Sequence, residues 1–382
     1  MPVVQQGSLN TTALVVPDLY VQIVPPQNLV LNGVPTNVVG IVGSAGWGPV
    51  NQPVVAATMA DYAAIFGAVM PRKYDMGTQV ATAVQQGAAN FRCVRVSDGT
   101  DTAAAFEIPA TSFVLTARYT GSLGSRIMVG LSSGSAAGTW KLTLSLPGVR
   151  PEVFDNIAGS GAAFWAAAAA AVNVGQGMAR GPSPIAVARD GGTTVAPSAF
   201  AWDFSSGTPG TDGAAISAVQ LVGVDGMPGT GMYALRGQGC TLALLADADD
   251  PTQWTTQAGF GLAEGIYMLL TGPAGDGISS AIAAKQTAGL DSYAAKLMFG
   301  DWVWWNDPVN QRLRLVSPQG FVAGRLANLS PEQSSLNKPL YGVVGTQKSG
   351  TPGTGQAASY SAAELALLIG AGIDVIANPQ PG

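Results

Sequence analysis

The chain has 382 residues, of which 47% are hydrophobic and only 11% are charged, and its net charge is −5. This length predicts two or three domains with a sizeable interior. The low charge content, against a typical ~25%, indicates either extensive burial against neighbouring molecules or an uncharged polar exterior rich in Ser, Thr, Gln and Asn. No run rich in Lys and Arg is present, so the electrostatic footprint of a nucleic-acid-binding protein is missing.

Missing residue types exclude several kinds of site. The sequence contains no histidine, which excludes a histidine general base, and its two cysteines cannot supply the four thiolates of a structural zinc site. We expect Cys93 and Cys240 to be buried thiols in a reduced compartment; a disulfide is the alternative.

No signal peptide is visible, and the longest apolar run, Ala162–Val174, is too short and too rich in alanine to span a bilayer.

The first 37 residues are predicted to be extended, because prolines interrupt short β-branched runs and disfavour helices and central strands. We interpret residues 1–25 as an arm that reaches out from the body; a disordered leader is the alternative. The apolar residues of its runs are the candidate linking residues: Leu14, Val15, Val16, Tyr20, Val21 and Ile23.

Residues 38–96 predict buried strands alternating with helices. Val38–Val42 is a nearly continuous apolar run, typical of a strand buried on both faces, and Phe91–Val96 is predicted to be another buried strand. Thr58 and Asp61 have the spacing of a capping box at the start of a helix, and a second helix is predicted over Met76–Asn90.

Residues 97–236 are richer in Gly, Ser and Thr. Strand-like alternation at 113–116, 127–131 and 141–146 is interrupted by an alanine-rich helix over 162–174. We interpret this part of the chain as an inserted α+β domain.

From Cys240 onwards, strand-like and helix-like runs alternate again. Strands are predicted over Thr241–Ala246, Ile266–Thr271 and Leu297–Trp305, and helices over Pro251–Glu264 and Ile278–Leu290. This order predicts right-handed crossovers and a largely parallel sheet flanked by helices, which is an α/β core.

The C-terminal region is predicted to be irregular over 323–349 and then to regain structure. Ser361 and Glu364 form a capping box, and Leu365, Leu368 and Ile369 make an apolar stripe along the following helix. A last strand is predicted over 373–377.

Three acidic residues, Asp247, Asp249 and Asp250, follow a predicted strand. Ligands do bind at the carboxyl ends of parallel strands, so a metal or acid–base site is conceivable. The alternative, which we favour, is that Asp250 caps the next helix ahead of Pro251 and that the other two are solvated. We predict no catalytic, cofactor or metal site.

Two groups of side chains are candidates for an interface. Trp302 and Trp304 are predicted to share one face of a strand and Trp305 to lie on the other; they could be a stacking platform, but a core or intersubunit anchor is favoured. The basic residues Arg312, Arg314 and Arg325 could contact an acidic partner surface, with simple solvation as the alternative.

Five stretches, in this order, resemble the tail sheath proteins of contractile bacteriophage tails. They are VVGIVGSAGWGPVNQP (38–53), MADYAAIFG (59–67), ATAVQQGAANFRCVRV (81–96), ARYTGSLGS (117–125) and SYAAKLMFGDWVWWNDPVNQRLRLVSPQGFVAGRLA (292–327). Thr120 stands where the family usually has proline, and family members usually continue beyond the last strand, whereas this chain ends at Gly382.

The resemblance implies a structural subunit without enzymatic activity or cofactor. Residues 26–96 and 237–382 would form the sheath core domain, 97–236 an outward-facing inserted domain, and 1–25 the linking arm. The subunits would form six-fold rings, stacked helically around a tail tube protein and bounded by baseplate and tail terminator proteins, with no nucleic-acid or membrane partner. The protein would be made in the host cytoplasm and lie in the virion.

Three functions therefore remain open. The resemblance favours a sheath that contracts and drives the tube through the host envelope. The sheath of a phage-tail-like bacteriocin or of a type VI secretion machine would share this fold. A metal-dependent α/β enzyme that uses Asp247 and Asp249 is the alternative from another class.

Overall fold

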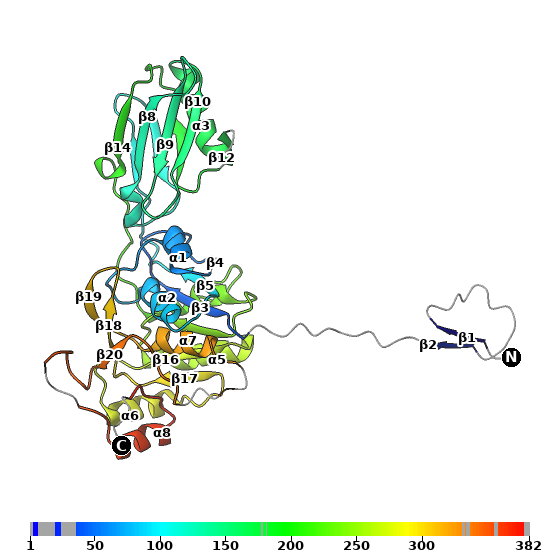
Figure 1. Cartoon of the computed structure of the whole chain (residues 1–382), viewed down its shortest axis with the longest axis vertical. Helices are drawn as coiled ribbons and strands as arrows, with labels where there is room; N and C mark the ends of the chain where they lie inside the picture. The colour runs from blue at the N-terminus through cyan, green and yellow to red at the C-terminus, as the bar shows by residue number, and fades with distance from the viewer. Residues whose placement is uncertain are drawn as a thin grey trace. The chain divides into compact units, whose positions relative to one another are not determined.

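The computed structural model describes residues 36–176, 182–330, 333, 337–354 and 358–377, and the backbone of 3–6, 20–23 and 179–180. The chain divides into two units, Met1–Pro35 and Thr36–Gly382 (Figure 1). In the described part of the first unit, β1 (Val3–Gln6) and β2 (Tyr20–Ile23) pair in parallel.

A six-stranded sheet forms the centre of the second unit, in the order β17-β16-β15-β3-β5-β4. Its strands are β3 (Val39–Gly43), β4 (Pro53–Ala56), β5 (Phe91–Arg95), β15 (Leu242–Leu245), β16 (Tyr267–Thr271) and β17 (Ala295–Met298). Every pair of neighbours is parallel except β4 and β5. β3 and β15 are buried along their whole length, as their apolar runs predict. The predicted α/β class is therefore confirmed.

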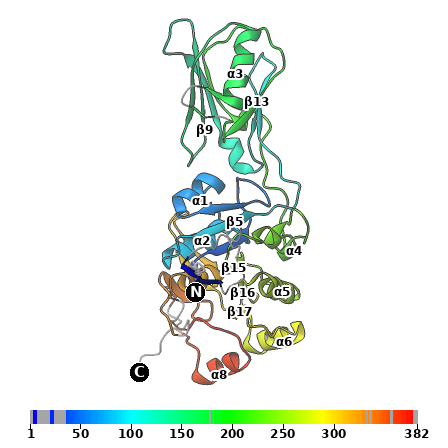
Figure 2. The same ribbon diagram turned by 90° about the vertical axis from the view of Figure 1, so that its right-hand side faces the viewer.

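Helices cover both faces of this sheet (Figure 2). On one face α1 (Met59–Phe66), α2 (Met76–Gln85) and α7 (Gln319–Ala327) pack on a cluster that contains Ile41, Phe91 and Leu244. On the other face lie α4 (Ala218–Val222), α5 (Trp254–Glu264), α6 (Ile278–Ala288) and α8 (Ala362–Gly370), around a cluster that contains Val42 and Leu270. Both predicted capping boxes, at Thr58 and Ser361, are present.

A smaller antiparallel sheet adjoins the core, in the order β19-β18-β20. Its strands are β18 (Val303–Asp307), β19 (Arg312–Val316) and β20 (Val343–Thr346). The single strand predicted over Leu297–Trp305 was wrong, because the chain turns at Gly300 and enters a different sheet. A Cβ atom at Gly300 would lie 2.1 Å from the Pro273 carbonyl oxygen, so the turn requires glycine.

Two further predictions at the C-terminal end need correction. Residues 323–349 are not irregular throughout, since they contain the end of α7 and all of β20. The strand predicted over 373–377 is reduced to one bridge between Met298 and Asp374. In α8, Leu368 is buried but Ile369 is 65% exposed, so the predicted apolar stripe faces the core only in part.

Over the described residues, the inserted segment contains two larger antiparallel sheets, in the orders β10-β9-β8-β14 and β13-β7-β6, and the two-stranded antiparallel sheet β11-β12. Its elements are β6 (Ala105–Glu107), β7 (Phe113–Ala117), β8 (Met128–Ser133), β9 (Trp140–Ser145), β10 (Glu152–Ile157), α3 (Ala162–Val174), β11 (Gly175–Gln176), β12 (Ala179–Arg180), β13 (Ala186–Asp190) and β14 (Phe200–Asp203). Short 3-10 helices are η2 (Ser122–Arg126), η3 (Phe204–Ser206), η4 (Gly231–Leu235) and η5 (Pro251–Gln253).

This segment has its own hydrophobic cluster, made of residues between Ala104 and Phe204 together with Trp47. By contrast, Ala218, Leu221 and Leu235 pack in the cluster of the core. The predicted insertion, 97–236, therefore includes a C-terminal part that packs with the core. Whether the segment folds by itself stays a prediction.

Candidate functional site

The three acidic residues after β15 each have a different partner. The prediction that Asp247 and Asp249 are solvated was wrong, because Asp247 is buried and Asp249 is paired. The carboxylate of Asp247 accepts hydrogen bonds from the Tyr74 N–H at 3.1 Å and the Gln79 side chain at 2.9 Å. Asp249 forms an ion pair with Lys73 at 2.9 Å. Asp250 accepts from the Thr252 N–H at 3.0 Å and caps the 3-10 helix that begins at Pro251, as predicted. The described residues hold no group of three or more acidic or cysteine side chains that could bind a metal ion.

Asp247 belongs to a buried polar network that joins three elements. Gln79, on α2, donates from its side-chain amide to Asp247 and to Ser317, and its side-chain Oε1 accepts from the N–H of Gly320 on α7 at 2.8 Å. Gln319 accepts from the Asp247 N–H at 3.0 Å and donates to the Leu269 carbonyl in β16. Burial raises the pKa of Asp247, and the hydrogen bonds oppose that shift. This network is a structural link between helices and sheet.

The tryptophans near β18 differ in exposure and bonding. Trp302 precedes the strand, is 7% exposed, and donates from Nε1 to the Gly272 carbonyl at 3.1 Å. Trp305 is buried and donates to Gln85 at 3.0 Å. Trp304 is half-buried, and its Nε1 has no hydrogen-bond partner among the described residues. That Nε1 atom is buried, so it is not exposed to a neighbouring molecule. An interface role for Trp302 and Trp304 stays a prediction.

The three candidate arginines are also placed differently. Arg314 is almost buried, pairs with Asp307 at 3.4 Å and donates to the Met70 carbonyl and the Thr78 hydroxyl. It is therefore a link within the subunit. Arg312 is exposed, and Arg325 is half-buried on α7 with its guanidinium 5.8 Å from the Tyr341 ring. An interface role for Arg312 and Arg325 stays a prediction.

The junction between core and insertion is built around Arg95, at the end of β5. Its guanidinium is buried and donates to the carbonyl oxygens of Ala45, Gly48 and Thr120 at 2.8–3.0 Å. It also pairs with Asp101 at 3.2 Å. Burial lowers the pKa of Arg95, and the neighbouring Asp101 opposes that shift.

A second set of contacts supports the same junction. Asp212 pairs with Arg72 at 2.5 Å and accepts from the Ser122 N–H at 2.7 Å. The Trp47 ring packs edge-on against Tyr119, with centroids 5.4 Å apart. This junction was not predicted from the sequence. Arg95 could have indicated it, because this arginine lies inside a run otherwise predicted to be a buried strand, and buried charges are nearly always paired.

The linking residues predicted in the arm lie in the first unit. Leu14, Val15 and Val16 lie outside the described residues. Tyr20, Val21 and Ile23 belong to β2, whose backbone pairs with β1 in the register Val21↔Val4. The linking role itself stays a prediction.

Cys93 and Cys240 are free and buried, and burial raises the pKa of both thiols, that of Cys240 to about 11.

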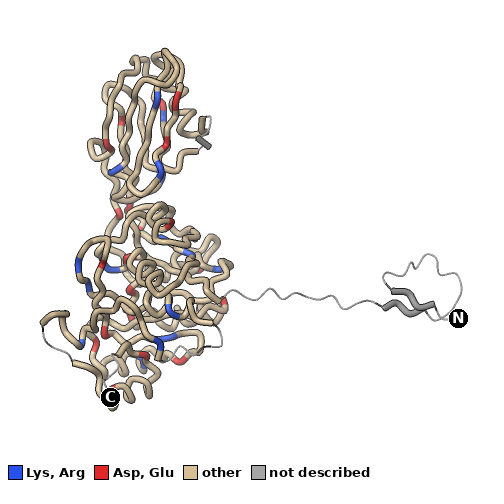
Figure 3. Tube along the Cα trace, viewed as in Figure 1, with Lys and Arg blue, Asp and Glu red and all other residues tan. Residues whose placement is uncertain are grey.

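Over the part of the chain that the structure describes, charged residues are scattered and of both signs (Figure 3). Among the helices it describes, none has the length and apolar character to cross a membrane.

Two solved structures share this fold. The sheath tail protein from Desulfitobacterium hafniense matches with a TM-score of 0.56, over 89% of this chain and 68% of its own. The sheath tail protein from Listeria innocua matches with a TM-score of 0.57, over 89% of this chain and 65% of its own. Each is 14% identical to this chain.

No family model matches the sequence, and no curated protein is significantly similar to it. The chain spans about two thirds of the length of the two sheath tail proteins, 68% of one and 65% of the other. The resemblance to tail sheath proteins predicted from the sequence is confirmed at the level of the fold.

Proposed function

We propose that this chain is a structural subunit of a contractile tail sheath, which polymerises around a tail tube and shortens to drive that tube through a host envelope. The observation that carries the proposal is the likeness to two sheath tail proteins over 89% of the chain. Such a subunit would lie in the virion and contact the tube, the baseplate and further copies of itself.

The surface of the core supports a role in assembly. Several large apolar side chains are exposed in the single subunit, among them Tyr293 at 89% and Leu367 and Ile369 at 59% and 65%. Leu367 and Ile369 lie on α8, whose inner side is held by Leu368. Because exposed apolar surface is costly, contact with neighbouring copies explains these positions.

The paired strands of the first unit support a linking role for the arm. An isolated two-stranded sheet is marginally stable in water, and each of its strands has an open edge. In the proposed sheath, these strands would complete sheets with neighbouring subunits, so that subunits tilt and slide without separating. Contraction would release free energy as new interfaces form.

The junction supports movement of core and insertion as one body. Arg95 ties the insertion to two carbonyl groups of the β3–β4 turn, and Asp212 adds an ion pair. A buried, fully bonded arginine resists rearrangement, because breaking its contacts leaves an unpaired charge. Contraction would therefore rearrange contacts between subunits and leave this junction intact.

Sedimentation velocity over a range of protein concentrations, together with metal analysis, tests the proposal against the enzyme alternative. A sheath subunit should convert from a small species to very large assemblies as concentration rises, with no stoichiometric metal. A species that stays small at every concentration and carries one metal ion per chain would contradict the proposal.

A further inference from the structure

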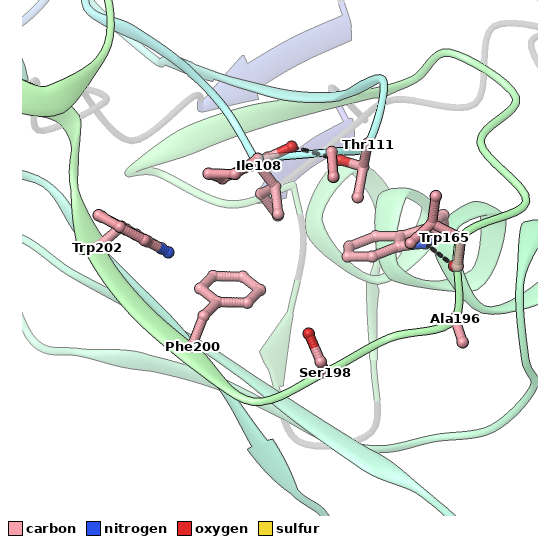
Figure 4. A pocket seen from close by; sticks show the side chains of 10 residues that line it. Ile108, Thr111, Trp165, Ala196, Ser198, Phe200 and Trp202 are labelled. Atoms are coloured by element: carbon pink, nitrogen blue, oxygen red, sulfur yellow. Dashed lines mark hydrogen bonds between the residues drawn. The ribbon is translucent and has the colours of Figure 1, made fainter.

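A cavity of about 270 Å³ lies in the inserted segment (Figure 4). Its walls come from the turn after β6, from α3 and from the stretch that leads into β14. The residues that matter for its chemistry are Ile108, Thr111, Trp165, Ser198, Phe200 and Trp202. The cavity lies apart from the acidic residues after β15 and from the junction at Arg95.

Three aromatic rings surround the cavity on different sides (Figure 4). Phe200 and Trp202 are two residues apart on β14, so they share one face of that strand. Trp165 is 2% exposed and is fixed in place by a hydrogen bond from its Nε1 to the Val195 carbonyl at 2.8 Å. Trp165 and Trp202 therefore lie on opposite sides of the cavity, with Phe200 between them (Figure 4).

Packing within the subunit covers only part of Trp202. Its ring contacts that of the buried Phe106, with centroids 6.4 Å apart, but 44% of the residue stays exposed. Its indole N–H points toward the middle of the cavity (Figure 4), and it makes no hydrogen bond with the residues that the structure describes. A large, half-exposed ring with a free donor is typical of a binding site.

The polar groups of the cavity are few and uncharged. The Thr111 hydroxyl is already used, since it donates to the Ile108 carbonyl at 2.8 Å. The Ser198 hydroxyl points into the cavity, and no partner for it is found over the described residues (Figure 4). Among the residues that the structure describes, no charged side chain lines the cavity. Its chemistry is thus aromatic surface with one N–H donor and one hydroxyl.

We propose that this cavity binds one uncharged sugar ring. The C–H face of a pyranose packs against aromatic rings, and its hydroxyl groups can accept from the Trp202 N–H and exchange hydrogen bonds with Ser198. Because no cation lines the cavity, phosphate and carboxylate ligands would lose their hydration without compensation. Ligand sites of this kind combine apolar walls with a few convergent polar groups.

Saturation-transfer NMR on the full chain tests this proposal and works equally on subunits and on assemblies. The probes are methyl α-D-glucopyranoside, methyl β-D-galactopyranoside, methyl N-acetyl-β-D-glucosaminide and a capped polyproline hexapeptide. At least one glycoside should show transfer that saturates with a Kd of about 1–10 mM, as expected for a ligand of this size. Trp202→Ala should weaken it at least about fivefold, and Trp202→Tyr should retain most of it.

Val153→Ala is the matched control, because Val153 is 47% exposed in the same segment and does not line the cavity. It should leave saturation transfer unchanged, and the melting temperatures of all variants should agree. The proposal is overturned if no glycoside shows saturable transfer, if Trp202→Ala binds like the unmodified chain, or if only the peptide binds. None of these results bears on whether the chain forms a sheath.

Discussion

Asp75 is a fully buried carboxyl group at the start of α2. Its Oδ2 accepts from the Thr78 N–H at 2.8 Å, whereas Oδ1 has no hydrogen-bond partner among the described residues. Burial raises the pKa of Asp75 to about 7, although Thr78 and the nearby Arg72 oppose the shift. Because this pKa lies above the unfolded value of 3.8, the folded state holds the proton more tightly. The contribution of Asp75 to the free energy of unfolding is therefore fully present below pH 3.8, and it is lost as the pH rises through about 7.

Asp75→Asn should remove that dependence, because asparagine is also a good N-cap residue and cannot ionise. Above pH 7 we expect the free energy of unfolding of the variant to exceed that of the unmodified chain by up to about 4 kcal/mol. The difference should shrink steadily as pH falls to 4. Urea titrations of both proteins at pH 4.5, 6 and 8 measure it. A difference that does not vary with pH would show that Asp75 is ionised throughout.

Gly324 is a second residue with a clear structural reason. It lies inside α7, where a Cβ atom would come within 2.3 Å of the Ala83 carbonyl oxygen on α2. Glycine usually weakens a helix, but here it permits α7 to approach α2 closely. Gly259, in α5, has open space around its Cβ position.

These two glycines make a matched pair of variants. Gly324→Ala should destabilise the subunit by about 1–3 kcal/mol, because the two helices must separate. Gly259→Ala should be neutral or stabilising by up to about 1 kcal/mol, because alanine favours the helix. Chemical denaturation of the two proteins compares them. Equal effects of the two substitutions would mean that α7 is not packed closely against α2.

At the scale of elements, the sequence predicted the core strands and the capping boxes well, because their signals are local. β3 and β15 are continuous runs of apolar residues and glycine, and Thr58 and Ser361 have partners three residues away. α7 was missed because Gly320 and Gly324 look like turn residues until the packing against α2 is known. The polar network of Gln79 and the cavity beside Trp202 join residues far apart in sequence, so no local pattern could indicate them.

The arm formed by the first unit is expected to serve assembly more than stability. Deleting residues 1–25 should leave a soluble subunit that melts cooperatively but does not form tubes. Val21→Pro with Ile23→Pro should act in the same way, because each proline removes a backbone N–H from β2. Val21→Thr with Ile23→Thr is the control, since threonine keeps the donor and favours strands.

Calorimetry and sedimentation of these variants distinguish the outcomes. Loss of the cooperative transition on deletion would show that the arm belongs to the subunit's own core. Normal tubes from the proline variant would show that β2 does not link subunits.

At the scale of the whole molecule, the inserted segment has a hydrophobic cluster of its own, and the two stretches of chain that lead into and out of it pair with each other at the antiparallel bridge Thr102↔Thr211. We expect residues 101–212 to fold when expressed alone with exchange-protected amides in β7, β8 and β9. The longer piece 97–236 should fold equally but expose Leu221 and Leu235, which pack in the core, and should aggregate more readily. Unprotected amides in both pieces would show that the insertion depends on the core.

The central claim is that this chain assembles as a sheath, and negative-stain electron microscopy of the concentrated full-length protein tests it most directly. We predict tubes or stacked rings, with six-fold symmetry in end-on class averages. Assembly should disappear in the variant lacking residues 1–25, while its single particles keep the size of the intact subunit. Dispersed single particles from the full-length protein at every concentration, with or without a tail tube protein, would contradict the account.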